Sequence, residues 1–161
     1  MRTGNGLDVH RFSELAGSAE FIRLGGVNIP HNRRLLAHSD GDVLLHALCD
    51  ALLGALALGD IGHHFPDTEP EYAGIDSLSL LARVYESLTF RGWYLLNADM
   101  TIVAQAPRMA PYIEAMQSAV ANCLDCQQDQ ISIKATTTEG LGFAGRREGL
   151  AVFATVLVSN D

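Results

Sequence analysis

The sequence predicts an α+β domain, a sandwich of one sheet and one layer of helices. Strand-like and helix-like segments share the chain in the order strand, hairpin, two helices, strand, helix and two strands. A chain of 161 residues is the size of one domain with its own core, and no repeat or low-complexity linker divides it. We therefore expect a single domain over residues 1–161. The last expected strand, residues 150–158, is apolar on both faces, which predicts burial on both sides and favours a subunit interface there.

The first half of the chain begins with an expected strand at residues 4–12, where Leu7 and Val9 alternate with polar side chains. Residues 21–30 hold two short apolar runs around a Gly-Gly pair, a pattern typical of a hairpin with a tight turn. The small, polar and basic stretches on either side of this hairpin are expected to be surface loops.

A long apolar helix follows the hairpin, and the rest of the chain is organised around it. The helix is expected to begin after Ser39 or Asp40, since either residue is a good N-cap, with Asp42 in its first turn. It should run to about Leu58, where Gly59 ends it. A helix that is apolar nearly all round should be buried.

Two polar residues, His46 and Asp50, lie on one face of this helix because they are one turn apart. Their burial requires hydrogen bonds, ion pairs or a metal. Asp8 and His10 share a face of the first strand, although on spacing alone a solvated polar face of an edge strand is the preferred interpretation of that pair. Two histidines and a carboxylate form a common catalytic zinc set. Asp50 has two open interpretations. It would either accept a hydrogen bond from a histidine that binds the metal, or accept hydrogen bonds from backbone groups in a purely structural role.

The second half of the chain adds one more helix pair and three strands. From hydrophobic periodicity and the positions of glycine and proline we expect a helix at residues 75–90 that ends at Gly92, and a second helix from Pro111 to about Leu124. Strands are expected at residues 93–105, 131–137 and 150–158. Two segments, residues 60–69 and 139–148, are expected to be loops because they are rich in glycine and turn-forming residues.

A second cluster of chemically useful groups lies at residues 134–145, where the sequence reads KATTTEGLGFAG. The three threonine hydroxyls and nearby backbone N–H groups can bind phosphate oxygens, and Glu139 is a hard oxygen ligand suited to Mg²⁺. A Thr-rich strand end followed by a glycine turn is the structural alternative. The sequence holds neither GxxxxGK[ST] nor GxGxxG, so a P-loop or dinucleotide-binding site has no support.

Charge and hydropathy argue against several classes of partner. The formal net charge is -8, whereas nucleic acids and anionic membranes attract a positive surface. No apolar run reaches the length of about 18 residues that a membrane helix needs, and the start of the chain, MRTGNG, lacks the apolar region of a secretory signal. We expect no nucleic-acid partner and no membrane partner.

The cysteines predict a cytoplasmic location. Three cysteines are an odd and sparse set, typical of reduced thiols. Cys123 and Cys126 have the spacing of a redox motif, but they end an expected helix instead of following a strand. We therefore expect all three to be incidental thiols.

Five stretches of the sequence resemble one enzyme family, and together they cover essentially the whole chain. They read GNGLDVHRF, GGVNIP, LLAHSDGDVLLHALCDALLGALALGDIGHHFPDTEP, ADMTIVAQAPRM and IKATTTEGLGFAGRREGLAV. In these motifs the chain resembles the 2-C-methyl-D-erythritol 2,4-cyclodiphosphate synthase family. The resemblance implies a ferredoxin-like subunit with a mostly four-stranded sheet, one helical layer and a small β-hairpin. It also implies a homotrimer with active sites between neighbouring subunits.

The activity that the resemblance implies is a step of the non-mevalonate isoprenoid pathway, catalysed by a phosphorus–oxygen lyase. The 2-phosphate of 4-diphosphocytidyl-2-C-methyl-D-erythritol 2-phosphate would attack the β-phosphorus, forming the 2,4-cyclodiphosphate and releasing CMP. The resemblance also implies one Zn²⁺ per subunit, Mg²⁺ or Mn²⁺ on the substrate diphosphate, and an isoprenoid diphosphate in the central trimer cavity.

The resemblance carries site roles to individual residues of this chain. Zinc ligands would be Asp8, His10 and His46, and Glu139 would hold the second divalent ion. His38 and Thr137 would stabilise the transition state. The substrate would contact Asp8, His10, His38, Ser39, Asp60, Ile61, Gly62, Phe65, Pro66, Asp67, Thr68, Glu69, Ala104, Gln105, Ala106, Pro107, Arg108, Met109, Ala110, Thr136, Thr137, Thr138, Glu139, Phe143 and Arg146. Of these, Phe143 and Arg146 would also lie near the trimer cavity, with Arg146 on the isoprenoid phosphate.

Some positions depart from the pattern expected of the family. Arg108 stands in place of lysine, His63 and His64 in place of lysine and an apolar residue, and Gly140 in place of a cation. We do not expect His63 and His64 to be metal ligands. Two other functions stay open on the residues alone, a zinc phosphohydrolase that delivers water and a non-catalytic trimeric binder of isoprenoid diphosphates.

Overall fold

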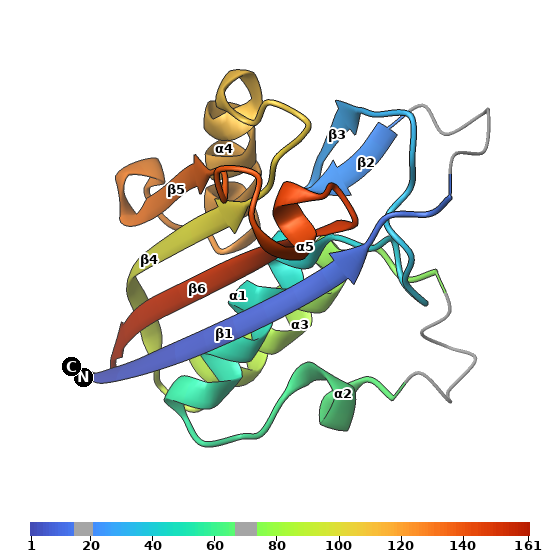
Figure 1. The fold of residues 1–161 in the computed structure, drawn as a ribbon. Coiled ribbons are helices and arrows are strands. Elements are labelled where there is room, and N and C mark those ends of the chain that lie inside the picture. Colours follow the sequence, from blue (N-terminus) through green and yellow to red (C-terminus); the bar gives the residue numbers. More distant parts are fainter. Residues whose placement is uncertain (15–20, 67–73) are drawn as a thin grey trace.

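The computed structural model describes residues 1–14, 21–66 and 74–161. Its central sheet has four strands in the order β1-β6-β4-β5, and a separate hairpin pairs β2 with β3. The strands are β1 (Arg2–Arg11), β2 (Phe21–Leu24), β3 (Val27–Pro30), β4 (Tyr94–Val103), β5 (Ile131–Thr136) and β6 (Gly149–Ser159). The predicted α+β class, four-stranded sheet and hairpin are confirmed (Figure 1).

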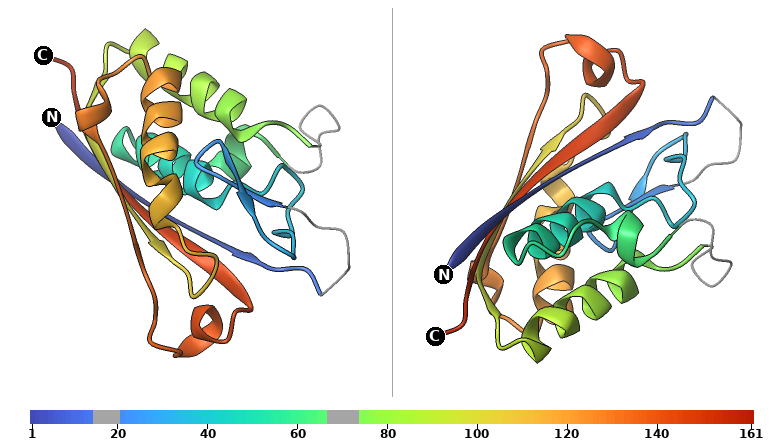
Figure 2. Two further views of the ribbon diagram at one scale, coloured as in Figure 1. Left: turned by 90° about the horizontal axis from the view of Figure 1, so that it is seen from above. Right: turned by 90° about the horizontal axis from the view of Figure 1, so that it is seen from below.

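Three helices of three turns or more cover one face of this sheet (Figure 2). They are α1 (Val43–Ala55), α3 (Ser77–Phe90) and α4 (Ile113–Cys123). Helix α1 packs on β1 and β6, α4 packs on β5, and α3 packs against both α1 and α4. The shorter helices are α2 (Ile61–His64), α5 (Gly142–Gly145), η2 (Ala110–Tyr112) and η3 (Gln128–Gln130). No helix in the described parts of the chain is long and apolar enough to cross a membrane.

The ferredoxin-like arrangement implied by the resemblance is wrong in its strand order. Helix α4 carries the chain from the end of β4 back to the start of β5, so these two strands are parallel. Strand β6 then enters between β1 and β4 and runs antiparallel to both. The sheet is therefore mixed, and β1 and β5 are its two edges.

The bounds of the central helix are also shorter than predicted. Its N-cap is Asp42, whose side chain accepts a hydrogen bond from the Leu45 N–H, and not Ser39 or Asp40. It ends at Ala55, because the chain turns back through Ala57 in the left-handed region, with a φ of 55°. The two segments predicted as loops each contain one short helix, α2 and α5.

The second face of the sheet carries exposed apolar side chains. Along β6, Phe153 keeps 52% of its surface exposed, whereas the residues that point to the helices are buried. Its neighbour across the strand pair is Leu7, which is 53% exposed. The prediction that the last strand is buried on both sides is thus wrong for the isolated chain, because none of the described helices covers Leu7 and Phe153.

Candidate active site

Asp8, His10 and His46 come together at one edge of the sheet. An oxygen of the Asp8 carboxylate, Oδ2, lies 3.1 Å from Nε2 of His10 and 3.1 Å from Nδ1 of His46. One ligand atom from each of the three side chains lies within 4.8 Å of the other two. No other group of three potential ligands of this kind occurs among residues 1–14, 21–66 and 74–161.

Close packing of α1 on β1 brings these residues within reach of one another. Side chains at even positions of β1 point to the helix, so Asp8 and His10 share a face with Gly4 and Gly6. A β-carbon on either glycine would lie 1.9 Å from a backbone oxygen of α1, and the glycines therefore allow the helix to approach. His46, which is only 6% exposed, then lies beside Asp8, the residue that follows Gly6 on that face of β1.

The electrostatics of the cluster keep the Asp8 carboxyl ionised, as a metal ligand must be. Burial acts to raise the pKa of the Asp8 carboxyl, but the hydrogen bonds and charges of His10 and His46 outweigh it and leave this pKa well below its usual range. Burial acts to lower the pKa of His46, and here the hydrogen bond and charge of Asp8 outweigh it and raise that pKa. The carboxylate is thus held in its charged form between two imidazoles.

The donor set fits a divalent transition metal. Two imidazoles and one carboxylate are a zinc-type set that leaves one position open. Ligand atoms that each lie about 2.0–2.2 Å from one tetrahedral ion are about 3.3–3.6 Å apart. The two 3.1 Å separations around Asp8 Oδ2 are close to this value, so an ion would need only small shifts of the side chains. The three predicted zinc ligands are therefore placed where a metal site requires them.

A cavity of about 320 Å³ opens beside the cluster. Its lining contains seven of the predicted substrate residues together with His46, namely Asp8, His10, His38, Ser39, Ile61, Gly62 and Phe65. We call this the metal-side cavity. Asp60 is not part of its lining and instead caps α2, because its side chain accepts a hydrogen bond from the His63 N–H at 2.9 Å. Pro66 is also absent from the lining, and Asp67, Thr68 and Glu69 lie outside the described residues.

The second predicted cluster forms its own cavity, of about 280 Å³, at the ends of β4 and β5. We call it the threonine-side cavity. Among the predicted substrate residues, its lining contains Ala104, Gln105, Pro107, Arg108, Met109, Ala110, Thr136 and Thr137. Ala106, Thr138 and Glu139 are not part of the lining. Glu139 is exposed and accepts a hydrogen bond from the Thr137 hydroxyl at 2.9 Å.

The structure does not bring the two cavities together within one chain. The metal-side cavity involves β1 and the threonine-side cavity involves β5, and these strands are opposite edges of the sheet. Three strand spacings of about 4.8 Å separate the edges by about 14 Å. Asp8 and His10 also point to the helix face, whereas the side chain of Thr136 belongs to the opposite face.

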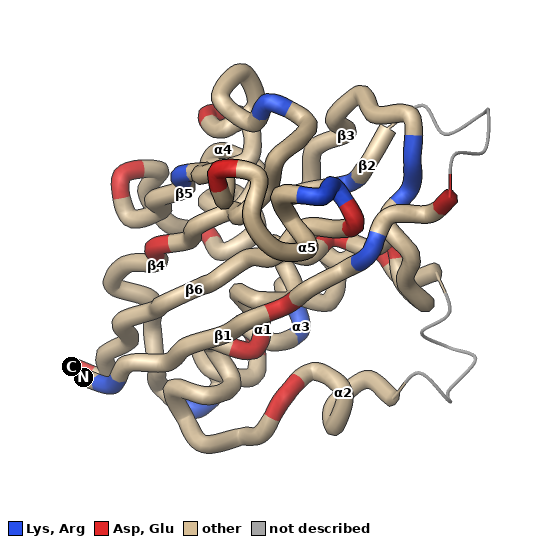
Figure 3. The backbone as a smooth tube through the Cα atoms, in the orientation of Figure 1, with Lys and Arg blue, Asp and Glu red and all other residues tan. Residues whose placement is uncertain are grey.

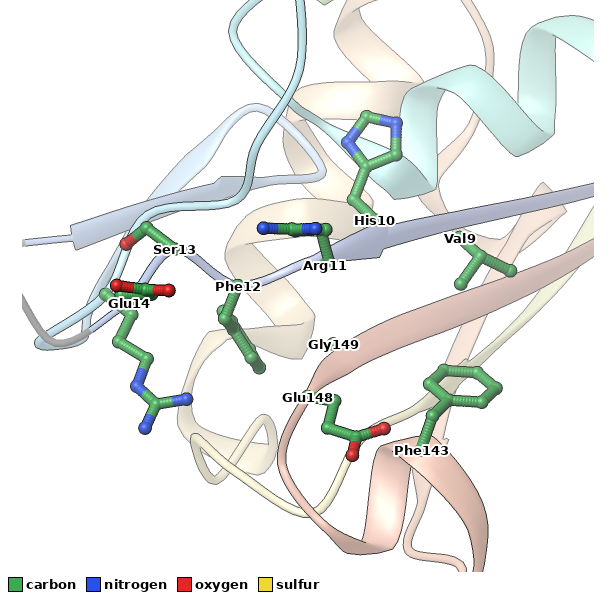
Figure 4. Close-up of a pocket in the computed structure, with 10 residues that line it drawn as sticks. Val9, His10, Arg11, Phe12, Ser13, Glu14, Phe143, Glu148 and Gly149 are labelled. Atoms are coloured by element: carbon green, nitrogen blue, oxygen red, sulfur yellow. The ribbon is translucent and has the colours of Figure 1, made fainter.

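Phe143 lies in a third cavity, of about 650 Å³, with Val9 and Glu148 (Figure 4). Arg146 does not line this cavity. Its guanidinium donates two hydrogen bonds to the Glu148 carboxylate, at 2.9 and 3.1 Å. Figure 3 shows basic and acidic segments side by side at this point of the chain, next to α5. The charge predicted to meet an isoprenoid phosphate is therefore already paired with a carboxylate.

The open question about Asp50 is answered by its hydrogen bond. Its Oδ1 accepts a hydrogen bond from the Ile61 N–H at 2.8 Å, so Asp50 holds the start of α2.

The structure also shows contacts of His46 that could not be predicted from the sequence. Nε2 of His46 lies 3.0 Å from the hydroxyl of Ser77, which in turn donates a hydrogen bond to Asp40. No local pattern marks Ser77, because it begins a helix 31 positions further along the chain.

Fold and site together define a class, that of α+β proteins with a metal-binding centre of two histidines and one aspartate beside an open cavity. The YgbB family model matches residues 1–159, and the chain belongs to the YgbB family. It is accordingly an enzyme, a lyase that acts on phosphorus–oxygen bonds.

Named relatives are similar to the chain over its full length. It is 58% identical to the 2-C-methyl-D-erythritol 2,4-cyclodiphosphate synthase of Alcanivorax borkumensis, over 100% of this chain and 98% of that protein. It is 60% identical to the synthase of the same name from Azotobacter vinelandii, over 98% of each. A solved structure of such a synthase in a CDP-bound form is 36% identical, with a TM-score of 0.88 over 98% of this chain and 100% of the other.

Proposed function

We propose that the chain converts 4-diphosphocytidyl-2-C-methyl-D-erythritol 2-phosphate to 2-C-methyl-D-erythritol 2,4-cyclodiphosphate and CMP, in the non-mevalonate isoprenoid pathway. The single observation that carries the proposal is the Asp8, His10 and His46 cluster beside the metal-side cavity, in a chain that matches synthases of this name end to end. The cytoplasmic location and the lack of nucleic-acid and membrane partners stay predictions from the sequence.

In the proposed reaction, an oxygen of the 2-phosphate forms a bond to the β-phosphorus while the bond from that phosphorus to the CMP oxygen breaks. Asp8, His10 and His46 would hold Zn²⁺, which supplies a Lewis acid for a phosphate oxygen. His38 at the metal-side cavity and Thr137 at the threonine-side cavity would donate hydrogen bonds to the charge that develops on the phosphoryl group. Glu139 would hold Mg²⁺ or Mn²⁺ on the diphosphate.

We propose that the active enzyme is a homotrimer in which the two cavities meet across a subunit interface. The proposal is supported by their positions in one chain, where the two cavities lie at opposite edges of the sheet. It is also supported by the exposed apolar residues on the open face of the sheet, among them Leu7, Val9 and Phe153. In this assembly the ends of β4 and β5 would bind the cytidine part with backbone groups.

The binding of an isoprenoid diphosphate at the trimer axis stays a prediction. The cavity beside Phe143 supplies apolar lining for it, but Glu148 would have to release Arg146 before the guanidinium could bind a phosphate.

His46→Ala tests the proposed function. Zinc content and CMP release should both fall to background, because the metal loses its ligand from the helix, while the circular dichroism spectrum stays that of a folded protein. His63→Ala is the matched control, since His63 is exposed on α2 and does not line the metal-side cavity. A metal-free His46→Ala variant with full activity would overturn the proposal.

The products distinguish the synthase from the two alternative functions. The synthase yields the cyclic diphosphate with CMP, a phosphohydrolase yields inorganic or monoester phosphate, and a binder of prenyl diphosphates yields no product. Phosphorus NMR of the reaction mixture separates these three outcomes.

A further inference from the structure

The two ring nitrogens of His46 have different environments. Nδ1 faces the Asp8 carboxylate at 3.1 Å, on the side of the metal cluster. Nε2 faces away from it, 3.0 Å from the Ser77 hydroxyl and 3.2 Å from the Ser39 hydroxyl. A neutral imidazole carries one proton, and only the nitrogen without the proton can bind a metal. The groups around Nε2 therefore decide whether Nδ1 is available.

The Asp40 carboxylate sets the direction of the hydrogen bonds at Ser77. Three donors point at it: the Ser77 N–H at 3.0 Å, the Ser77 hydroxyl at 2.5 Å and the Asp42 N–H at 3.2 Å. Because a carboxylate accepts and does not donate, the hydroxyl proton of Ser77 is directed to Asp40. The lone pairs of the Ser77 oxygen then remain for His46.

From this geometry we infer that Asp40 and Ser77 are positioning residues for the metal site. Asp40 accepts the Ser77 proton and Ser77 accepts the Nε2–H of His46, so the proton that a metal bound beside Asp8 displaces is the one on Nδ1. Partners of this kind fix the orientation and tautomer of a metal-bound histidine in general. The inference rests on the proposed metal site and extends it by two residues that do not touch the metal.

Ser77 and Ser39 have different roles in this arrangement. Ser77 is fully buried, and its hydroxyl is held by both Asp40 and His46. Ser39 lines the metal-side cavity, is only partly buried, and also accepts a hydrogen bond from the Gly41 N–H at 3.2 Å. The buried hydroxyl of Ser77 is thus the constant partner of His46, and the Ser39 hydroxyl at the cavity keeps its own proton to donate to a substrate.

Zinc affinity, measured by competition with a chelator, gives the first test. Ser77→Ala should weaken zinc binding by about 10- to 100-fold, the usual effect of removing such a partner. Ser79→Ala is the matched control, because Ser79 lies in the same first turn of α3 but is exposed, and its hydroxyl donates to Asp76. Equal zinc affinity of the two variants would overturn the inference.

The tautomer of His46 gives a second test that needs neither metal nor activity. In an Asp8→Ala background, nitrogen NMR in alkaline buffer should show the proton of His46 on Nε2. Adding Asp40→Ala should move part of it to Nδ1, because the Ser77 hydroxyl loses its acceptor and can then donate to Nε2.

A proton on Nδ1 in Asp8→Ala alone would overturn the inference whatever the chain's activity. If the double variant fails to fold, which a thermal melt reveals, the Asp8→Ala spectrum and the Ser77→Ala affinity still decide it. Failure of the proposed function would appear separately, as a lack of zinc or of CMP release in the unmodified chain.

Discussion

Gly6 and Ala47 are in such close contact that a β-carbon at position 6 would lie 1.9 Å from the Ala47 carbonyl oxygen. A second close contact of this kind between β1 and α1 lies between Gly4 and Ala51. Because Asp8 and His10 continue the same face of the strand, the distance between helix and strand also sets the distance between His46 and the other two cluster residues.

We therefore expect Gly6→Ala to destabilise the fold by about 3 kcal/mol, since the added methyl group forces backbone to move. Zinc affinity should fall with it, because His46 moves with the helix. Gly54→Ala is the control: its β-carbon would meet only the Asn5 oxygen at 3.7 Å, and alanine favours the helix by up to about 1 kcal/mol. Chemical denaturation measures both, and equal stability of the two variants would contradict the prediction.

Asp42 ties the β2–β3 hairpin to α1. Its buried carboxylate accepts hydrogen bonds from the N–H groups of Gly25 at 2.8 Å, Gly26 at 2.7 Å and Leu45 at 3.1 Å. Asp42→Ala should cost about 3 kcal/mol of unfolding free energy, because it removes a helix cap and leaves buried donors unpaired. Asp76→Ala, which removes the exposed cap of α3, should cost only about 1 kcal/mol. A similar loss in the two variants, measured by urea titration, would argue against the additional role of Asp42.

Asp50→Ala should separate substrate binding from metal binding. Loss of its bond to the Ile61 N–H frees the start of α2, which lines the metal-side cavity, so KM should rise about tenfold. Zinc content should stay at the level of the unmodified chain, and Asp50→Asn should behave nearly normally because its amide oxygen can still accept. Loss of zinc in Asp50→Ala, by elemental analysis, would instead make Asp50 a support of His46.

The three thiols should react slowly with iodoacetamide at about pH 8. Burial raises the pKa of Cys49 well above its ordinary value, and it also raises the pKa of Cys123 and Cys126. A raised pKa leaves less thiolate at this pH than a free cysteine has, and the thiolate is the reactive form. Mass spectrometry should find Cys49 unmodified until the protein is unfolded. Rapid alkylation of Cys126, or a disulfide between it and Cys123, would show that this pair has redox activity.

Leu7→Asp should break the proposed trimer, because it places a charge on the open apolar face of the sheet. Light scattering should give the mass of a single chain, and CMP release should be lost. Phe90→Ser is the control, since Phe90 is 91% exposed but lies at the end of α3 and not on the sheet. An unchanged mass for Leu7→Asp would place the interface elsewhere.

Mixed trimers should recover activity from two inactive variants. His46→Ala removes the metal side of the site and Thr137→Ala removes the threonine side. If each site draws on two chains, unfolding and refolding the variants together restores some intact sites. Activity no greater than the sum of the two separate variants would mean that one chain supplies the whole site.

The sequence by itself determined the class of the fold, the positions of the main strands and helices, and the residues of the metal cluster. Strand periodicity is local, so the shared face of Asp8 and His10 follows from their spacing alone. The burial of His46 likewise follows from the apolar helix around it. The motifs along the whole chain added the family, and with it the expected reaction.

Only the tertiary structure decided the contacts between segments that are distant in the chain. It made Asp42 the cap of α1, because the hairpin delivers two more donors to that carboxylate. It brought Asp50 into a hydrogen bond with the start of α2 and Ser77 into a hydrogen bond with His46. It also placed β6 in the middle of a mixed sheet. Each of these outcomes depends on how closely two elements pack. That distance is set by side-chain volumes on both surfaces at once, and no pattern within a single segment contains it.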